Sequence, residues 1–254
     1  IMQGPMANVS DNADFAAAVF ANGGLPFMAL GNLPADLADN MLAAGKEKVA
    51  RFGAGMIGIE AFNPTITHHL ASVKKYNAPF ALFAGGIPSQ VKELEEAGTK
   101  TYLHTPSLMM LENALQKDCQ RFIFEGTEAG GHVGTLGSMV LWELAMEKMS
   151  ALPDDQLADK TMVFAGGIGT DLAPHFISGM TAHIAGRGVK IGIQVGTAYL
   201  FTCEIIESGA IKKIYQDVIC ERDEIIIMGN TAGLASRTVA TPFSQRMIDN
   251  QHHR

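Results

Sequence analysis

The segment EGTEAGGHVG places one imidazole close to two carboxylates and follows the apolar run RFIF. His132 can donate a hydrogen bond or take up a proton near neutral pH, beside Glu125 and Glu128. The adjacent glycines Gly130 and Gly131 have no Cβ, so the chain can pass close beneath a ligand there. A histidine bonded only to loop carbonyls is the alternative, but the flanking glycines favour an imidazole that faces a ligand. We therefore expect His132 to be the catalytic side chain.

Two glycine turns later in the chain have the composition of an anion site. Gly166 and Gly167 follow the apolar run TMVF, and Gly196 and Thr197 follow IGIQV. Backbone N–H groups and the N-terminus of a short helix supply partial positive charge, so a phosphate can be held there without a lysine. Two ordinary tight turns are the alternative, but their occurrence together favours a phosphate site.

The loop between the first apolar run and the first helical pattern joins small and rigid residues, GPMANVS. Its backbone could touch a flat ligand, while Ser10 or Asp11 could cap the helix that follows. A different segment, GAGMIG, fits the dinucleotide-binding pattern GxGxxG. It follows what reads as a helix end, and no acidic residue stands about twenty positions further on, so we interpret it as a strand with closely packed glycines.

The remaining histidines are not spaced like metal ligands, and we expect no metal site. His104 is the exception to watch, because it ends a predicted strand. The others are interpreted as structural or surface residues: His68, His69, His175, His183, His252 and His253. Trp142 is expected to pack in a helix rather than stack on a cofactor.

The elements that must position these residues alternate between strand and helix patterns along the whole chain. Such alternation is typical of a parallel sheet, and eight strands are the number that closes a TIM (β/α)8 barrel. The predicted strands are Ile1–Val9, Leu25–Leu30, Gly55–Ile59, Pro79–Ala84, Thr99–His104, Arg121–Glu125, Thr161–Ala165 and Lys190–Val195. Helical periodicity appears over Ile87–Ala97 and again over Ile205–Val218. No Pro/Ser-rich linker divides residues 1–254, so a single α/β domain is expected.

Composition excludes several classes of protein. The 254 residues carry a formal charge of −7 without a run of Lys or Arg, so nucleic acid is not an expected partner. The three cysteines lack CxxC spacing, which argues against disulfides and structural zinc and favours a reducing compartment. No long apolar stretch or signal-peptide pattern occurs, so we expect a cytoplasmic protein without a membrane span. The start on an apolar, strand-like segment suggests a piece of a longer chain.

Four motifs of the chain, GPMANVSDNADFAAAVFANGG, EGTEAGGHVG, FAGGIGT and QVGTAYL, resemble in sequence and order those of the nitronate monooxygenase family, formerly called 2-nitropropane dioxygenases. That family includes flavin-dependent enoyl-acyl-carrier-protein reductases. The resemblance covers about residues 1–201 and implies a TIM barrel that binds FMN, with His132 facing the reactive side of the flavin. The residues it places at the cofactor are Pro5, Met6 and Ala7 beside the ring and Gly166, Gly167, Gly196 and Thr197 around the phosphate. We also expect Glu125, Gly130 and Gly131, in the segment before His132, to contact the cofactor.

The sequence departs from that family at two positions. GAGMIG stands where the family usually has an Asn, and Glu125 stands where it often has Gln. The carboxylate of Glu125 would repel a reduced anionic flavin unless it is paired or protonated.

Three functions follow as hypotheses. The first is FMN-dependent oxidation of a small nitronate or carbanion-like donor, with O2 as acceptor. The second is reduction of an enoyl thioester, with NAD(P)H as reductant, inside a fatty-acid or polyketide synthase. The third is a non-catalytic barrel within a multienzyme. The expected partners are a small-molecule or acyl-thioester substrate, and either other domains of a multienzyme or a second copy of the chain.

Overall fold

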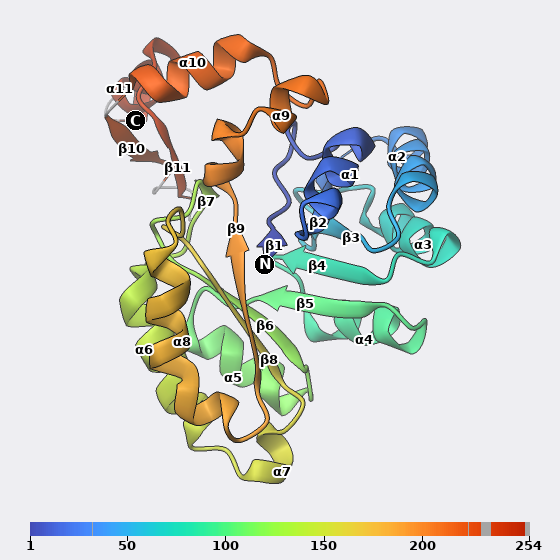
Figure 1. The fold of residues 1–254 in the computed structure, drawn as a ribbon, viewed down its shortest axis with the longest axis vertical. Helices are drawn as coiled ribbons and strands as arrows, with labels where there is room; N and C mark the ends of the chain where they lie inside the picture. Colours follow the sequence, from blue (N-terminus) through green and yellow to red (C-terminus); the bar gives the residue numbers. More distant parts are fainter. Residues whose placement is uncertain (32, 223, 230–234, 252–254) are drawn as a thin grey trace.

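A closed barrel of eight parallel strands forms the centre of the protein (Figure 1). The structure, a computed structural model, describes residues 1–31, 33–222, 224–229 and 235–251. The barrel strands are β1 (Met2–Gln3), β2 (Leu25–Gly31), β3 (Gly53–Ile57), β4 (Phe80–Ala84), β5 (Lys100–His104), β6 (Arg121–Glu125), β8 (Thr161–Ala165) and β9 (Lys190–Val195). They pair in chain order, and β1 closes the barrel by pairing with both β2 and β9. The predicted TIM barrel is confirmed.

Helices cover the outside of the barrel (Figure 1). They are α1 (Ala13–Ala21), α2 (Ala35–Lys48), α3 (Ile66–Tyr76), α4 (Pro88–Glu96), α5 (Leu108–Gln116), α6 (Ser138–Ser150), α7 (Asp154–Leu157) and α8 (Leu172–Ala185). In α4 the apolar face is buried through Val91 and Leu94, as the periodicity predicts. Ile87 is 55% exposed, because it is the residue that precedes the helix and Pro88 begins it.

Two apolar clusters hold these layers together. Inside the barrel, side chains of five different strands meet: Phe27, Leu82, Tyr102, Ile123 and Val163. A larger cluster fills the space between strands and helices, and Trp142 belongs to it. The Trp142 indole donates a hydrogen bond to the Phe124 carbonyl oxygen at 3.1 Å and meets the Phe164 ring edge-on. The prediction that Trp142 packs in a helix is confirmed.

Three strands match their predicted bounds, and the first strand does not. β1 has two residues where nine were predicted. The chain turns immediately after it, since the Met6 carbonyl oxygen accepts hydrogen bonds from the backbone of Val9 and Ser10 at 3.0 and 2.8 Å. The GAGMIG segment is strand β3, as expected, although it begins two residues earlier than predicted. A Cβ at Gly55 would overlap Pro5, so this glycine lets the first loop lie against the strand.

The part of the chain after β9 differs most from expectation. The continuous helical pattern predicted over residues 205–218 is wrong, because Gly209, with φ of +74°, ends the first helix. The elements are η1 (Thr197–Phe201), α9 (Glu204–Glu207), α10 (Lys213–Glu221), β10 (Ile225–Met228), β11 (Ser236–Val239) and α11 (Pro242–Gln251). β10 and β11 form a separate antiparallel sheet with the short strand β7 (Gly131–His132), which the sequence did not predict.

The C-terminal elements gather beyond the end of the barrel toward which β9 points (Figure 1). In a parallel barrel this is the carboxyl end of the strands, where active sites are built. None of the helices described in the structure has the length and apolar character needed to cross a membrane. His252 and His253 lie outside the described residues.

Candidate active site

A cavity of about 790 Å³ opens at the carboxyl end of the barrel. Its volume lies in the range of small-molecule sites, about 300–1,000 Å³. All the residues proposed from the sequence line it: Pro5, Met6, Ala7, Glu125, Gly130, Gly131, His132, Gly166, Gly167, Gly196 and Thr197. The loops after the first and the last barrel strands therefore meet at one place, because β1 pairs with β9 to close the barrel.

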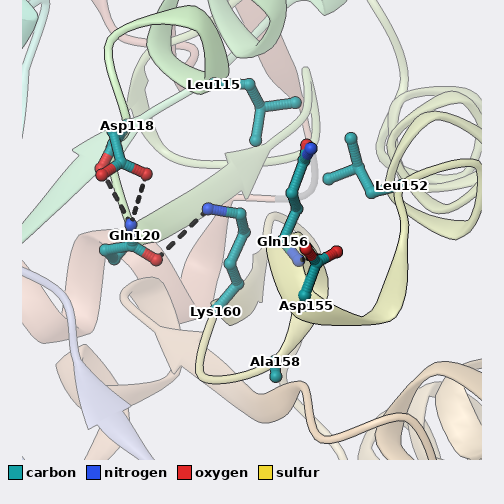
Figure 2. A pocket seen from close by; sticks show the side chains of 8 residues that line it. All are labelled: Leu115, Asp118, Gln120, Leu152, Asp155, Gln156, Ala158 and Lys160. Atoms are coloured by element: carbon teal, nitrogen blue, oxygen red, sulfur yellow. Dashed lines mark hydrogen bonds between the residues drawn. The ribbon is translucent and has the colours of Figure 1, made fainter.

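A smaller cavity of about 240 Å³ lies near the amino ends of β6 and β8 (Figure 2). Lys160 is only 4% exposed there, and its ammonium donates to the Gln120 side-chain oxygen at 3.2 Å. Burial lowers the pKa of Lys160. Gln120 in turn donates to the Asp118 carboxylate at 2.8 Å, as the dashed lines in Figure 2 show. Polar groups at this end of a barrel serve stability, so we place the candidate active site in the larger cavity.

The glycine turns after β6, β8 and β9 lie against one another. A Cβ built on Gly169 would be 4.0 Å from the Cβ of Ala198, and one built on Gly130 would be 2.8 Å from the Thr197 hydroxyl. Gly166 and Gly167 have φ angles of +100° and +72°, a conformation that favours glycine. These turns present backbone rather than side chains to the cavity.

Three polar side chains from separate strands meet where the barrel ends, and we call them the floor cluster: His104 on β5, Glu125 on β6 and Gln194 on β9. The Nε2 atom of His104 lies 3.4 Å from Oε2 of Glu125, and the Gln194 amide donates to the same oxygen at 3.5 Å. Both His104 Nε2 and Gln194 Oε1 are buried without a hydrogen-bond partner among the described residues. Because buried polar atoms are normally paired, the floor cluster has the character of a ligand-binding surface.

Burial changes the ionisation of this cluster. It raises the pKa of Glu125 to about 7 and lowers the pKa of His104 to about 4, because removal from water disfavours both charged forms. Near neutral pH His104 is therefore uncharged and Glu125 is about half protonated. The carboxyl group of Glu125 thus carries only part of the negative charge that was expected to repel a reduced flavin.

Glu128, in contrast, is an ionised structural group at the cavity rim. Its carboxylate accepts hydrogen bonds from the backbone and hydroxyl of Ser138 at 2.7 and 2.6 Å, at the beginning of α6. Burial opposes its ionisation, but the Ser138 hydrogen bonds outweigh that effect and lower the pKa of Glu128. A carboxylate at a helix N-terminus is also stabilised by the helix dipole. Arg237 donates to the Glu128 carbonyl oxygen at 2.8 Å, which joins the C-terminal sheet to this loop.

His132 lies on β7, is exposed and lines the cavity. It is held by the C-terminal sheet, because β7 pairs with β11 through His132 and Ser236. The backbone that carries the imidazole is therefore held on one side by β11.

Some cavity residues were absent from the sequence-based site. Gln194 and the apolar residues Leu200, Phe201, Ile219, Ile225 and Val239 belong to this group. Gln194 could have been found from the sequence, because it is a polar residue within the apolar run IGIQV, two positions before a glycine turn.

His69, which lies outside the cavity, is structural as expected. It is buried, with its ring nitrogens 2.9 Å from the Leu33 carbonyl oxygen and 3.2 Å from the Asn63 amide.

No protein-family model and no curated protein matches the chain, but solved structures do. FabK from Thermotoga maritima is 23% identical, with a TM-score of 0.78 over 96% of this chain and 72% of that one. Nitroalkane oxidase from Streptomyces ansochromogenes is 21% identical, with a TM-score of 0.76 over 96% and 77%. The enoyl reductase domain of MlnA from Bacillus amyloliquefaciens is 11% identical, with a TM-score of 0.75 over 97% and 65%. At these identities the similarity establishes the fold.

Proposed function

We propose that the protein is an FMN-dependent oxidoreductase. The observation that carries the proposal is the convergence of three glycine turns and the first loop on one cavity at the carboxyl end of the barrel. This is where barrels bind phosphate through backbone groups. The similarity to nitroalkane oxidase and to an enoyl reductase domain supports the same class of reaction.

The residues of the cavity fit an FMN molecule. Gly196 has no atom within 4 Å of where its Cβ would lie, so the turn leaves open space for a phosphate. The unpartnered atoms of His104 and Gln194 are suited to the polar edge of a flavin ring, which both donates and accepts hydrogen bonds. Pro5, Met6 and Ala7 would lie beside the ring. Bound FMN would supply hydride transfer, while the protein supplies position and electrostatics.

Reduction of an enoyl thioester is the reaction we favour, with NAD(P)H as the reductant. The cavity has an apolar wall, and an acyl chain has the apolar surface to cover it. The residues of this wall are Leu200, Phe201, Ile219, Ile225 and Val239.

Oxidation of a small nitronate, with O2 as acceptor, is the second candidate, and it is favoured by the similarity to nitroalkane oxidase. In either reaction His132 would orient the substrate or exchange a proton with it.

A visible spectrum of the purified protein with FMN tests the cofactor. Bound flavin gives a yellow protein whose absorption bands differ from those of free FMN and persist through gel filtration. A colourless protein that does not retain FMN would support the third hypothesis, a non-catalytic barrel.

Anaerobic rapid mixing tests the reaction. We expect NAD(P)H to bleach the bound flavin and a crotonyl thioester to restore its colour. Bleaching by an alkyl nitronate but not by either nicotinamide would instead assign nitronate oxidation.

A further inference from the structure

Glu125 and His104 form a close pair of titratable side chains within the floor cluster. The two side chains are 15% and 16% exposed, and their nearest atoms are 3.4 Å apart. Gln194 is 7% exposed and its amide reaches the same carboxyl oxygen at 3.5 Å. A Cβ on Gly4 would lie 3.1 Å from the Gln194 side chain, so the first loop confines that amide.

The elements around the pair present few other titratable groups. On β8 the residue in register with Glu125 is Ala165, and beneath the pair β5 places the phenol of Tyr102 inside the barrel. The cavity also contains His132, Glu128 and Arg237, all at the rim. Among the described lining residues Arg237 is the one Lys or Arg, and it is engaged with the Glu128 carbonyl oxygen.

Negative charge that enters this cavity therefore meets no lysine or arginine at the floor. A nearby anion disfavours ionisation of a carboxyl group and raises its affinity for a proton. We propose that the Glu125–His104 pair is the proton acceptor of the site, taking up one proton from solvent when reduction adds negative charge to the bound flavin. Gln194 is the positioning residue that holds the Glu125 carboxyl toward His104. This inference rests on the proposed function.

The charges balance in this step. Hydride from a reduced nicotinamide carries two electrons and one proton, so its transfer leaves one negative charge on the acceptor while the nicotinamide is oxidised to its cation. The Glu125 carboxylate binds one proton, forming one O–H bond, and the total charge of acceptor and pair is unchanged. Burial already raises the pKa of Glu125 to about 7, so the uptake falls in the neutral to mildly alkaline range.

Infrared difference spectroscopy of the FMN-loaded full chain measures this proton directly. At pH 8 the bound flavin is reduced electrochemically through a soluble mediator, and the reduced-minus-oxidised spectrum is recorded in H2O and D2O. We expect a carboxylic-acid C=O band to appear on reduction and to shift in D2O. The band should be absent in Glu125→Gln. It should remain in Glu112→Gln, which removes a surface carboxylate paired with Lys148.

His104→Phe tests the pair itself, because it keeps an aromatic ring but removes the acceptor nitrogen. The carboxylic-acid band should shift in frequency, because a carbon replaces the His104 nitrogen that lies 3.4 Å from the carboxyl oxygen. An unmoved band would assign the proton to Glu125 alone and contradict the role of His104. FMN that binds and is reduced without any such band overturns this inference alone, whereas FMN that does not bind overturns the proposed function.

Discussion

Two histidines face the same cavity in opposite environments. His132 is exposed on β7, whereas His104 is buried beside Glu125. The flanking glycines identified the first from the sequence, and the end of a predicted strand drew attention to the second. Their partners could not be predicted, because Glu125 and Gln194 approach His104 only when the barrel closes. The exposed imidazole of His132 can contact a substrate, whereas the buried imidazole of His104 lies against the side chains beside it.

Replacement of His132 by alanine should slow the chemical step and leave FMN binding intact. A positioned acid or base contributes about 10²- to 10⁴-fold to the rate, while the backbone pairing of β7 with β11 does not need the imidazole. Rapid-reaction measurement of flavin reoxidation by the substrate gives the rate. His183→Ala is the matched control, since His183 contacts Ser150 on the outer helices. An unchanged rate would make His132 a structural residue.

Glu125 should make the protein less stable as the pH rises. In the folded chain the Glu125 carboxyl group keeps its proton until about pH 7. In the unfolded chain it loses that proton near its ordinary pKa of 4.5. Stability therefore falls with pH between these values, because the folded state binds more protons. Glu125→Gln has no carboxyl group and removes this effect. The free energy of unfolding of the variant, relative to that of the wild type, should therefore be greater at pH 8 than at pH 4 by up to about 3 kcal/mol. Urea unfolding at both pH values measures the difference, and a constant difference would contradict the raised pKa of Glu125.

At the scale of elements, the sequence was most informative where apolar runs end in glycine. β6, β8 and β9 match their predicted bounds because each run is followed by a turn that needs glycine or a short loop. Apolar periodicity gave a wrong prediction where a turn interrupts the chain but the spacing of apolar residues continues across it. The pattern over residues 205–218 continues across Gly209, although the chain there adopts a left-handed conformation.

Substitutions in the turns after β8 and β9 should affect the stability of the fold and the binding of FMN separately. Gly167→Ala should destabilise the protein by about 1–2 kcal/mol, because L-residues disfavour a left-handed backbone and Gly167 has φ of +72°. Gly196 has φ of −113°, and its Cβ would enter open space. Gly196→Ala should therefore unfold much like the wild type but bind FMN less tightly. Urea unfolding and fluorescence titration with FMN distinguish the two effects, and tight FMN binding by Gly196→Ala would contradict the phosphate assignment.

At the scale of the whole molecule, the site depends on contacts between segments far apart in the chain. β1 pairs with β9, and β11 pairs with β7, so both ends of the chain complete one cavity. The barrel could be predicted because alternating strands and helices leave few topologies. The C-terminal sheet could not, since β7 has only two residues and no strand pattern of its own.

FMN should stabilise the entire fold, because its proposed contacts join the loops after β1, β6, β8 and β9. A ligand at 100 times its Kd adds about 2.7 kcal/mol to the free energy of unfolding, which corresponds to a rise in Tm of several degrees for a chain of this size. Riboflavin has the same ring without the phosphate, so at equal concentration it should raise the Tm less. In Gly196→Ala the two ligands should become similar, because the phosphate loses its space. Thermal scans of both proteins with both ligands make the comparison, and equal stabilisation of the wild type by riboflavin would show that the glycine turns do not hold a phosphate.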